Sequence, residues 1–182
     1  MPKISIASQK PSAKRRGASQ KGKTAIYPGT FDPVTYGHID LIKRASRIFD
    51  RVIVAVAHSK SKGTLFSVGE RVELLKRSTK GIKRVEIEDF DGLVVDYVKA
   101  SGANVMVRGL RMISDFEYEF QMALTNRKLA GDIETIFMMP HEDYSYVSSK
   151  LIKETAALGA SLGNFIPKEV EAALKKKLKP GF

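Results

Sequence analysis

Short apolar runs alternate with amphipathic stretches from residue 24 to the end of the chain. The run Val-Ile-Val-Ala-Val-Ala at 52–57 consists of β-branched and small side chains, which is typical of a strand covered on both faces. Four further runs are also predicted as strands, and they cover residues 24–27, 85–90, 104–108 and 135–140. The pattern therefore predicts about five short strands.

Apolar residues at helical spacing fill the segments between and after those runs. The predicted helices cover residues 38–49, the stretch after Ser67, the stretch around 94–98, residues 114–130, residues 148–158 and the stretch that starts at Pro167. The helix at 114–130 is the longest, and Phe116, Phe120 and Ala123 share one apolar face of it.

Two serine–glutamate pairs at a spacing of three predict helix starts. They are Ser67 with Glu70 and Ser114 with Glu117. In such a capping box the serine hydroxyl and the glutamate carboxylate accept hydrogen bonds from backbone N–H groups that the helix itself cannot satisfy.

Strands and helices in regular alternation predict an α/β fold. We expect a Rossmann-like parallel sheet of about five strands, with helices on both faces and further helices at the C-terminus. In such sheets ligands bind beyond the carboxyl ends of the strands. The loops that follow residues 27, 57, 90, 107 and 140 are therefore the expected site of chemistry.

Charge is distributed unevenly along the 182 residues, which carry a net charge of +11. Residues 1–23 hold seven lysines and arginines and no acidic residue, so residues 24–182 carry only +4. The first segment has few large apolar residues, and we predict a disordered basic extension that precedes a single domain at 24–182. We favour the interpretation that residues 1–23 are a leader outside the domain. The alternative is that they form an arm that binds polyanions.

Composition excludes several classes of protein. The chain has no cysteine, which rules out a disulfide framework, a thiolate zinc site, an iron–sulfur cluster and a cysteine nucleophile. It also has no run of about 18 apolar residues, so we expect no membrane span.

The loop after the first predicted strand, residues 28–38, is suited to binding an anion. Gly29 and Gly37 let backbone N–H groups approach a ligand closely, and His38 stands where a helix starts, next to its free N–H groups. The loop has neither the glycine spacing of a dinucleotide-binding fingerprint nor the Gly-Lys-Ser/Thr of a phosphate loop. A different phosphate chemistry is therefore indicated.

Three ordered motifs resemble those of one family. They are Tyr-Pro-Gly-Thr-Phe-Asp-Pro with Thr-Tyr-Gly-His at 27–38, Val-Arg-Gly-Leu-Arg with Asp-Phe-Glu-Tyr-Glu and Asn-Arg within 107–127, and Tyr-Ser-Tyr-Val-Ser-Ser at 144–149. Together they are similar to the motifs of bacterial phosphopantetheine adenylyltransferases, in the nucleotidylyltransferase superfamily. The resemblance spans about residues 24–178, and it departs at Lys150, where many members have serine.

The resemblance implies a reaction and its partners. Members transfer the adenylyl group of ATP to 4′-phosphopantetheine and release dephospho-coenzyme A and pyrophosphate. It further implies Mg²⁺ that arrives with ATP rather than in a protein metal site, a cytoplasmic homo-oligomer that is typically a hexamer, sensitivity to coenzyme A, and no membrane or nucleic-acid partner.

The resemblance also implies roles for individual residues. His38 would be the catalytic residue, because it donates to the α-phosphate as negative charge grows there. Contacts to the acceptor are implied for Thr30, Lys62, Val94 and Arg108. Contacts to ATP are implied for Thr30, Phe31, His38, Gly109, Leu110, Arg111, Glu119, Tyr144, Ser145, Tyr146, Val147, Ser148, Ser149 and Lys150.

Other interpretations of these features remain open. The acceptor could be another phosphorylated compound, such as nicotinamide mononucleotide or glycerol 3-phosphate, or the chain could be a polyanion-binding protein. Arg108 and Arg111 could form surface ion pairs with Asp115 or Glu119. Ser148 and Ser149 could cap a helix, a role that is compatible with anion binding.

Overall fold

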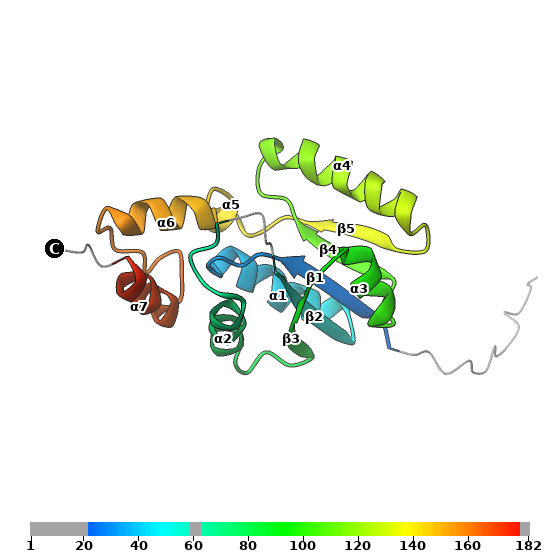
Figure 1. The fold of residues 1–182 in the computed structure, drawn as a ribbon, viewed down its shortest axis with the longest axis horizontal. Helices are drawn as coiled ribbons and strands as arrows, with labels where there is room; N and C mark the ends of the chain where they lie inside the picture. The colour runs from blue at the N-terminus through cyan, green and yellow to red at the C-terminus, as the bar shows by residue number, and fades with distance from the viewer. Residues whose placement is uncertain (1–21, 59–62, 179–182) are drawn as a thin grey trace, which may run out of the picture.

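The computed structural model describes residues 22–58 and 63–178. Five parallel strands form one sheet in the order β3-β2-β1-β4-β5, which confirms the predicted fold class (Figure 1). The order reverses between β1 and β4, where loops from adjacent strand ends diverge to opposite sides and leave room for a ligand. The strands are β1 (Thr24–Gly29), β2 (Arg51–Ala57), β3 (Val85–Phe90), β4 (Val105–Gly109) and β5 (Glu134–Met138).

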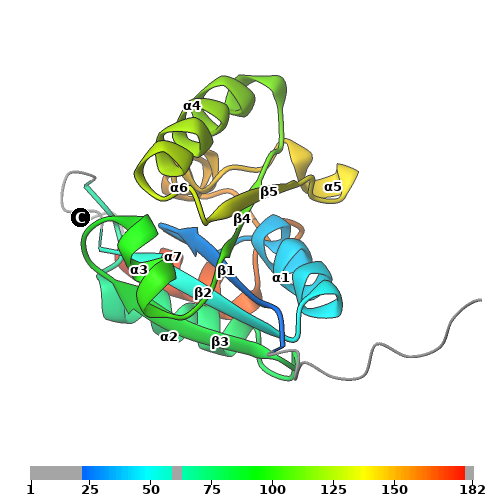
Figure 2. The ribbon, with the colours of Figure 1, turned by 90° about the vertical axis from the view of Figure 1, so that its right-hand side faces the viewer.

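Helices cover both faces of the sheet. Figure 2 shows α3 and α4 on one side and α1 on the other. The helices are α1 (Tyr36–Ile48), α2 (Val68–Ser78), α3 (Val94–Ala100), α4 (Ile113–Leu129), α5 (Glu142–Ser145), α6 (Ser149–Ala157) and α7 (Lys168–Lys177). The four-residue α5 was not predicted from the sequence.

Alternate residues of the central strands supply two separate cores. Val52, Val54 and Val56 of β2 pack with residues of α1, α2, α6 and α7, whereas Ile53 and Ala55 pack with α3 and the segment after α4. All five are buried. The continuous apolar run at 52–57 is explained by this arrangement, because a strand between two helical layers has no polar face.

The predicted capping box at Ser67 and Glu70 is confirmed at the start of α2. The box predicted at Ser114 and Glu117 is wrong, since α4 begins earlier, at Ile113, and has no capping hydrogen bond from a side chain. The reason lies in the preceding turn. Asp115 accepts hydrogen bonds from both the backbone and the side chain of Arg111, which places Ser114 inside the helix.

The apolar face of α4 exists but does not pack on the sheet. Phe116 and Phe120 stack on each other, yet they are 47% and 45% exposed. Asn126 is the one buried residue of this helix. The helical spacing of these residues therefore predicted a shared apolar face but not whether that face is buried.

Residues 1–21, most of the predicted basic extension, lie outside the described residues, and so does Lys62. Lys23 already contacts the domain, because its backbone N–H donates to Asp50 Oδ2 at 2.8 Å. Within residues 22–58 and 63–178, no helix combines the length and apolar character needed to cross a bilayer.

Candidate active site

A cavity of about 420 Å³ opens at the carboxyl ends of β1 and β4, as the position of the strand-order reversal predicts. Its walls come from the loop after β1, from α1, from the loop after β4, and from the start of α6. It brings together eleven of the residues singled out from the sequence: Thr30, Phe31, His38, Arg108, Gly109, Arg111, Glu119, Val147, Ser148, Ser149 and Lys150.

Five other sequence candidates do not line this cavity. Val94 packs in the core that lies between the sheet and α3. Leu110, Tyr144, Ser145 and Tyr146 are not on the cavity wall either, although Leu110 and Tyr146 are each next to a lining residue in the chain. The Tyr144 ring contacts the rings of Tyr36 and His141, so it holds α5 against α1.

Two glycines permit close approaches that shape the cavity. A Cβ atom at Gly109 would lie 2.7 Å from Leu41 Cδ1, so any larger residue at the end of β4 would force the Leu41 side chain of α1 to shift. A Cβ atom at Gly37 would lie 3.3 Å from Tyr144 Cβ, which limits how large that residue can be. Both glycines line the cavity.

His38 is the third residue of α1, and its orientation is fixed by the cap of that helix. Its Nδ1 accepts a hydrogen bond from the backbone N–H of Thr35 at 3.0 Å, and its own N–H donates to Thr35 Oγ1 at 3.4 Å. Because Nδ1 is used as an acceptor, the neutral ring carries its proton on Nε2. His38 lines the cavity and can therefore offer an N–H donor to a ligand.

The charge state of His38 follows from its surroundings. Burial, together with the nearby charges of Arg111 and Arg108, lowers its pKa from 6.5 to about 4. At neutral pH the imidazole is therefore uncharged. It can stabilise an anion as a hydrogen-bond donor, but it does not act as an imidazolium.

Arg108, at the end of β4, is held on both sides of its guanidinium group. Its Nε donates to Glu119 Oε2 at 2.7 Å, its Nη2 donates to Glu119 Oε1 at 2.5 Å, and its Nη1 donates to Pro28 O at 2.6 Å. Burial disfavours the charge on Arg108, but the hydrogen bonds that Arg108 donates to Glu119 outweigh it and raise the pKa of Arg108. The pair joins α4 to the ends of β1 and β4.

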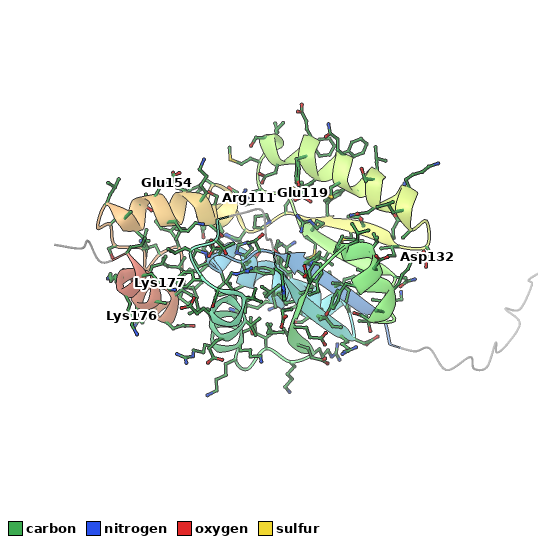
Figure 3. The ribbon with its side chains drawn as sticks, in the orientation of Figure 1. Arg111, Glu119, Asp132, Glu154, Lys176 and Lys177 are labelled. Atoms are coloured by element: carbon green, nitrogen blue, oxygen red, sulfur yellow. The ribbon has the colours of Figure 1, made fainter. Side chains whose placement is uncertain are left out.

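Arg111 connects the start of α4 to the segment before α6. Its Nε and Nη2 each lie 3.0 Å from an oxygen of Asp115, and its Nη1 donates to Val147 O at 2.8 Å. The ion pairs that the sequence suggested are thus present, as Arg108–Glu119 and Arg111–Asp115. Their residues line the cavity instead of lying on a surface away from it. Figure 3 labels Arg111 and Glu119, both of which line the cavity, in the region between the ribbons of α6 and α4.

The start of α6 presents a second helix N-terminus to the cavity. Ser148 caps the helix, because its Oγ accepts from the N–H of Leu151 at 3.0 Å. Ser149 Oγ donates to Pro33 O at 2.7 Å and so ties α6 to the first loop. The N-termini of α1 and α6 both border the cavity, and their free N–H groups and partial positive charge favour an anion there.

Asp32 and Lys153 form a pair that the sequence did not reveal. Lys153 Nζ donates to Asp32 Oδ2 at 2.6 Å, and the backbone N–H groups of Leu65 and Phe66 donate to the same carboxylate at 3.0 and 2.9 Å. Burial opposes the charge of Asp32, but these hydrogen bonds prevail and lower its pKa. Asp32 belongs to the first motif, whereas Lys153 lies on α6 with no local signal of a site.

The carboxylates on the cavity wall are Asp32, Asp115 and Glu119, and each is paired with a lysine or an arginine. Over residues 22–58 and 63–178, no group of three or more histidine, aspartate or glutamate side chains is placed to hold a metal ion. The arrangement favours ligands that bring their own negative charge.

Comparison with known proteins identifies the family. A cytidylyltransferase-like family model matches residues 26–155. A phosphopantetheine adenylyltransferase from Caldanaerobacter subterraneus subsp. tengcongensis is 55% identical over 157 residues, which cover 86% of this chain and 98% of the relative. The chain belongs to the phosphopantetheine adenylyltransferase family.

Two further comparisons were made, one with a second sequence relative and one with a solved structure. A phosphopantetheine adenylyltransferase from Desulfitobacterium hafniense strain Y51 is 52% identical over 158 residues, covering 87% of this chain and 97% of the relative. A solved structure of a putative nicotinate-nucleotide adenylyltransferase from Vibrio parahaemolyticus superposes with a TM-score of 0.62 at 18% identity, over 84% of this chain and 97% of that one. The structural likeness supports the fold, while the family rests on the sequence relatives.

Proposed function

We propose that this chain transfers the adenylyl group of ATP to 4′-phosphopantetheine, which yields dephospho-coenzyme A and pyrophosphate in coenzyme A biosynthesis. The observation that carries the proposal is the 55% identity over nearly the whole length of a phosphopantetheine adenylyltransferase. In this reaction an oxygen of the acceptor phosphate forms a bond to the α-phosphorus of ATP. The bond from that phosphorus to the bridging oxygen of the β-phosphate breaks, and pyrophosphate leaves with the electron pair.

The nucleophile requires little help from a base. A phosphate monoester has a second pKa of about 6, so it is largely a dianion at neutral pH. The tasks left to the protein are to align the two phosphates and to stabilise the charge that develops during transfer. A cavity bordered by two helix N-termini and a neutral histidine donor fits those tasks.

His38 is the proposed catalytic residue. Its Nε2–H would donate to a nonbridging oxygen of the α-phosphate, where negative charge increases in the transition state. A neutral donor serves here because its proton stays on the ring throughout transfer. Thr35 keeps the ring in position through Nδ1.

The two substrates are assigned to different parts of the cavity wall. Arg111, Ser148 and Ser149 would bind the phosphates of ATP, whereas Thr30 and Arg108 would hold the attacking phosphate of the acceptor. Thr30 and Arg108 lie on neighbouring strand ends, because Arg108 donates to Pro28 O just before Thr30. Lys62, a further proposed acceptor contact, lies outside the described residues.

Mg²⁺ is proposed to enter as part of the nucleotide substrate. The three carboxylates on the cavity wall already accept hydrogen bonds from lysine or arginine, so they are not arranged as a cage for a bare cation. Mg²⁺ in such sites keeps several waters and is bound largely through substrate phosphates. Its contribution would be to neutralise the departing pyrophosphate.

The protein is also proposed to be a homo-oligomer, as a hexamer, in the cytoplasm. Large apolar side chains lie exposed on and beside α4, and Ile113 is 90% exposed. The exposed large apolar side chains of this region are Met112, Ile113, Phe116, Tyr118, Phe120, Leu124, Leu129, Ile136 and Met139. An exposed apolar surface of this kind is typical of a contact between subunits. Light scattering should therefore show an assembly that Phe116→Lys disrupts, and a monomeric wild type would contradict the proposal.

The activity is tested by direct turnover. Protein, Mg²⁺ and ATP are mixed with 4′-phosphopantetheine, nicotinamide mononucleotide or glycerol 3-phosphate in separate reactions, with CTP replacing ATP in a further set. Pyrophosphate release is followed and products are identified by mass. We expect dephospho-coenzyme A from the first acceptor alone.

His38→Ala is the matched variant for this assay. Loss of one preorganised donor to a developing oxyanion lowers kcat by roughly 10²–10³-fold. Turnover with a different acceptor would support the reaction class but contradict the assignment of 4′-phosphopantetheine as the acceptor. Absence of turnover with every acceptor would revive the polyanion-binding alternative, which salt-dependent binding of wild type and of a chain lacking residues 1–23 then tests.

A further inference from the structure

A buried arginine lies behind the cavity wall. Arg71, on the first turn of α2, is 1% exposed and is among the largest fully buried side chains of the described residues. It does not line the cavity. Burial lowers its pKa, and the nearby charge of Asp32 partly offsets that effect. A buried charge is costly, so its contacts should explain why this position is not simply apolar.

The guanidinium group of Arg71 donates to backbone carbonyls of three separate segments. Nη1 donates to Thr30 O at 2.7 Å and to Ala57 O at 2.9 Å, and Nε donates to Phe66 O at 3.2 Å. Thr30 belongs to the first loop, Ala57 ends β2, and Phe66 precedes α2. One side chain thus connects segments separated by up to 41 residues.

Two of these segments supply the cavity wall at the same end. Thr30 lines the cavity, and so does Thr64, two residues before Phe66. Asp32 adds a complementary link, because it accepts the N–H groups of Leu65 and Phe66. The first loop and the segment before α2 are therefore joined by a cation that binds carbonyls and an anion that binds N–H groups.

We infer that Arg71 is a positioning residue that fixes Thr30, and with it the acceptor end of the cavity, through the Thr30, Ala57 and Phe66 carbonyls. The inference rests on the proposed function for the identity of the acceptor. A planar guanidinium group can meet three carbonyls in fixed directions, whereas a lysine ammonium at the same place is a single compact donor group. Arg71→Lys keeps the charge but places all its donors on one nitrogen, which cannot occupy the positions of both Nε and Nη1.

The nucleotide end of the cavity is held by other contacts. His38 is oriented by Thr35, α6 is tied to Pro33 by Ser149, and Arg111 reaches Val147. None of these contacts passes through Arg71. Loss of Arg71 should therefore affect the two substrates unequally, which a general loss of stability would not do.

The experiment compares Arg71→Lys with two variants on the same helix. Leu75→Ala removes a fully buried apolar side chain of the same helix, and it tests the effect of lost stability. Arg77→Lys changes an exposed arginine that pairs with Glu73. We expect Arg71→Lys to lower kcat/KM for 4′-phosphopantetheine by on the order of 10²-fold while the Kd for ATP stays within about twofold, since small misplacements of reacting groups are costly. Both control variants should keep wild-type kinetics below their unfolding temperatures.

A second readout does not depend on turnover. Hydrogen exchange of the ligand-free protein should be faster over residues 29–32 in Arg71→Lys than in Leu75→Ala. Equal changes in both variants, or equal effects on ATP and acceptor, would overturn the inference. Arg71→Gln is the second variant, and failure of both Arg71 variants to fold would show a purely structural role. If wild type turned over no acceptor, the proposed function would fail, and the exchange comparison would still decide whether Arg71 positions Thr30.

Discussion

Helices α1 and α4 both carry residues of the cavity wall, yet they are attached to the protein in different ways. Helix α1 has a capping box and buries Gly37, Ile39, Leu41, Ile42 and Ala45. Helix α4 is longer, lacks a side-chain cap and buries only Asn126. The first is fixed by apolar packing, whereas the second is fixed near the site by the Arg108–Glu119 and Arg111–Asp115 ion pairs.

The difference shows how the two sides of the cavity obtain their precision. The position of a side chain on α1, such as His38, is set by a close-packed core that allows the helix few other positions. A side chain on α4, such as Glu119, is located by its own contact with the site. The outer apolar face of α4 is left for a second copy of the chain in the proposed oligomer.

The largest expected contrast is in stability. Ile42→Ala on α1 should lower the free energy of unfolding by about 2–5 kcal/mol, because it leaves a cavity in the core. Phe116→Ala on α4 should change it by less than about 0.5 kcal/mol at protein concentrations where the chain is monomeric. Denaturant unfolding measures both. A Phe116→Ala effect that grows with protein concentration would show that the α4 face is covered by another copy.

The next contrast concerns the ion pair that connects α4 to the site. Glu119→Gln should lower kcat/KM by about tenfold or more, since one of the two acceptors of Arg108 becomes an amide donor and the negative charge that pairs with Arg108 is lost. Glu117→Gln, at an exposed position on the same helix, is the matched control and should leave kcat/KM unchanged. Steady-state kinetics with each substrate varied in turn provide the measurement. Equal rates in the two variants would mean that α4 is located without its ion pair.

The third contrast is a pH dependence that arises from α1. The pKa of His38 is about 4 in the folded protein, against 6.5 for an unperturbed histidine. As the pH falls from 6.5 towards 4, the unfolded chain binds a proton that the folded protein does not. Stability from this residue is therefore complete above pH 6.5 and decreases through that window.

His38→Asn should remove this part of the pH dependence of the free energy of unfolding, which amounts to at most about 1.4 kcal/mol per pH unit. His141→Asn, at an exposed histidine, should leave it in place. Unfolding curves between pH 7 and pH 4.5 make the comparison. An unchanged slope in His38→Asn would show that the buried ring is not the source.

Features that depend on neighbouring residues in the chain were predicted well. The five strands, the alternation with helices and the Ser67–Glu70 capping box all follow from local patterns. The error at Ser114 is also local, because it arises from a contact between residues four apart in the chain. The start of α4 is set by the contact of Asp115 with Arg111, and the same Ser-x-x-Glu pattern therefore lies one residue inside the helix.

In the candidate site, residues that belong to local motifs were predicted, whereas residues that depend on contacts distant in the chain were missed. Residues within the three motifs reached the cavity wall because motifs at strand ends converge there. Arg71 and Lys153 were missed because each lies on an ordinary amphipathic helix. Their partners, Thr30 and Asp32, are 41 and 121 residues away in the chain. No local pattern marks a side chain whose role comes from such distant contacts.

The sequence by itself determined the α/β alternation, the anion-binding character of the first loop and the family to which the three motifs belong. These depend on side-chain periodicity, on glycines near helix starts and on residue identity, all of which are local. Only the tertiary structure decided that His38 is a neutral donor through Nε2, that Arg108 and Arg111 are paired inside the cavity, and that α4 turns an apolar face outward. Protonation, ion pairing and exposure depend on which residues the fold brings within a few ångströms, and sequence spacing does not specify that.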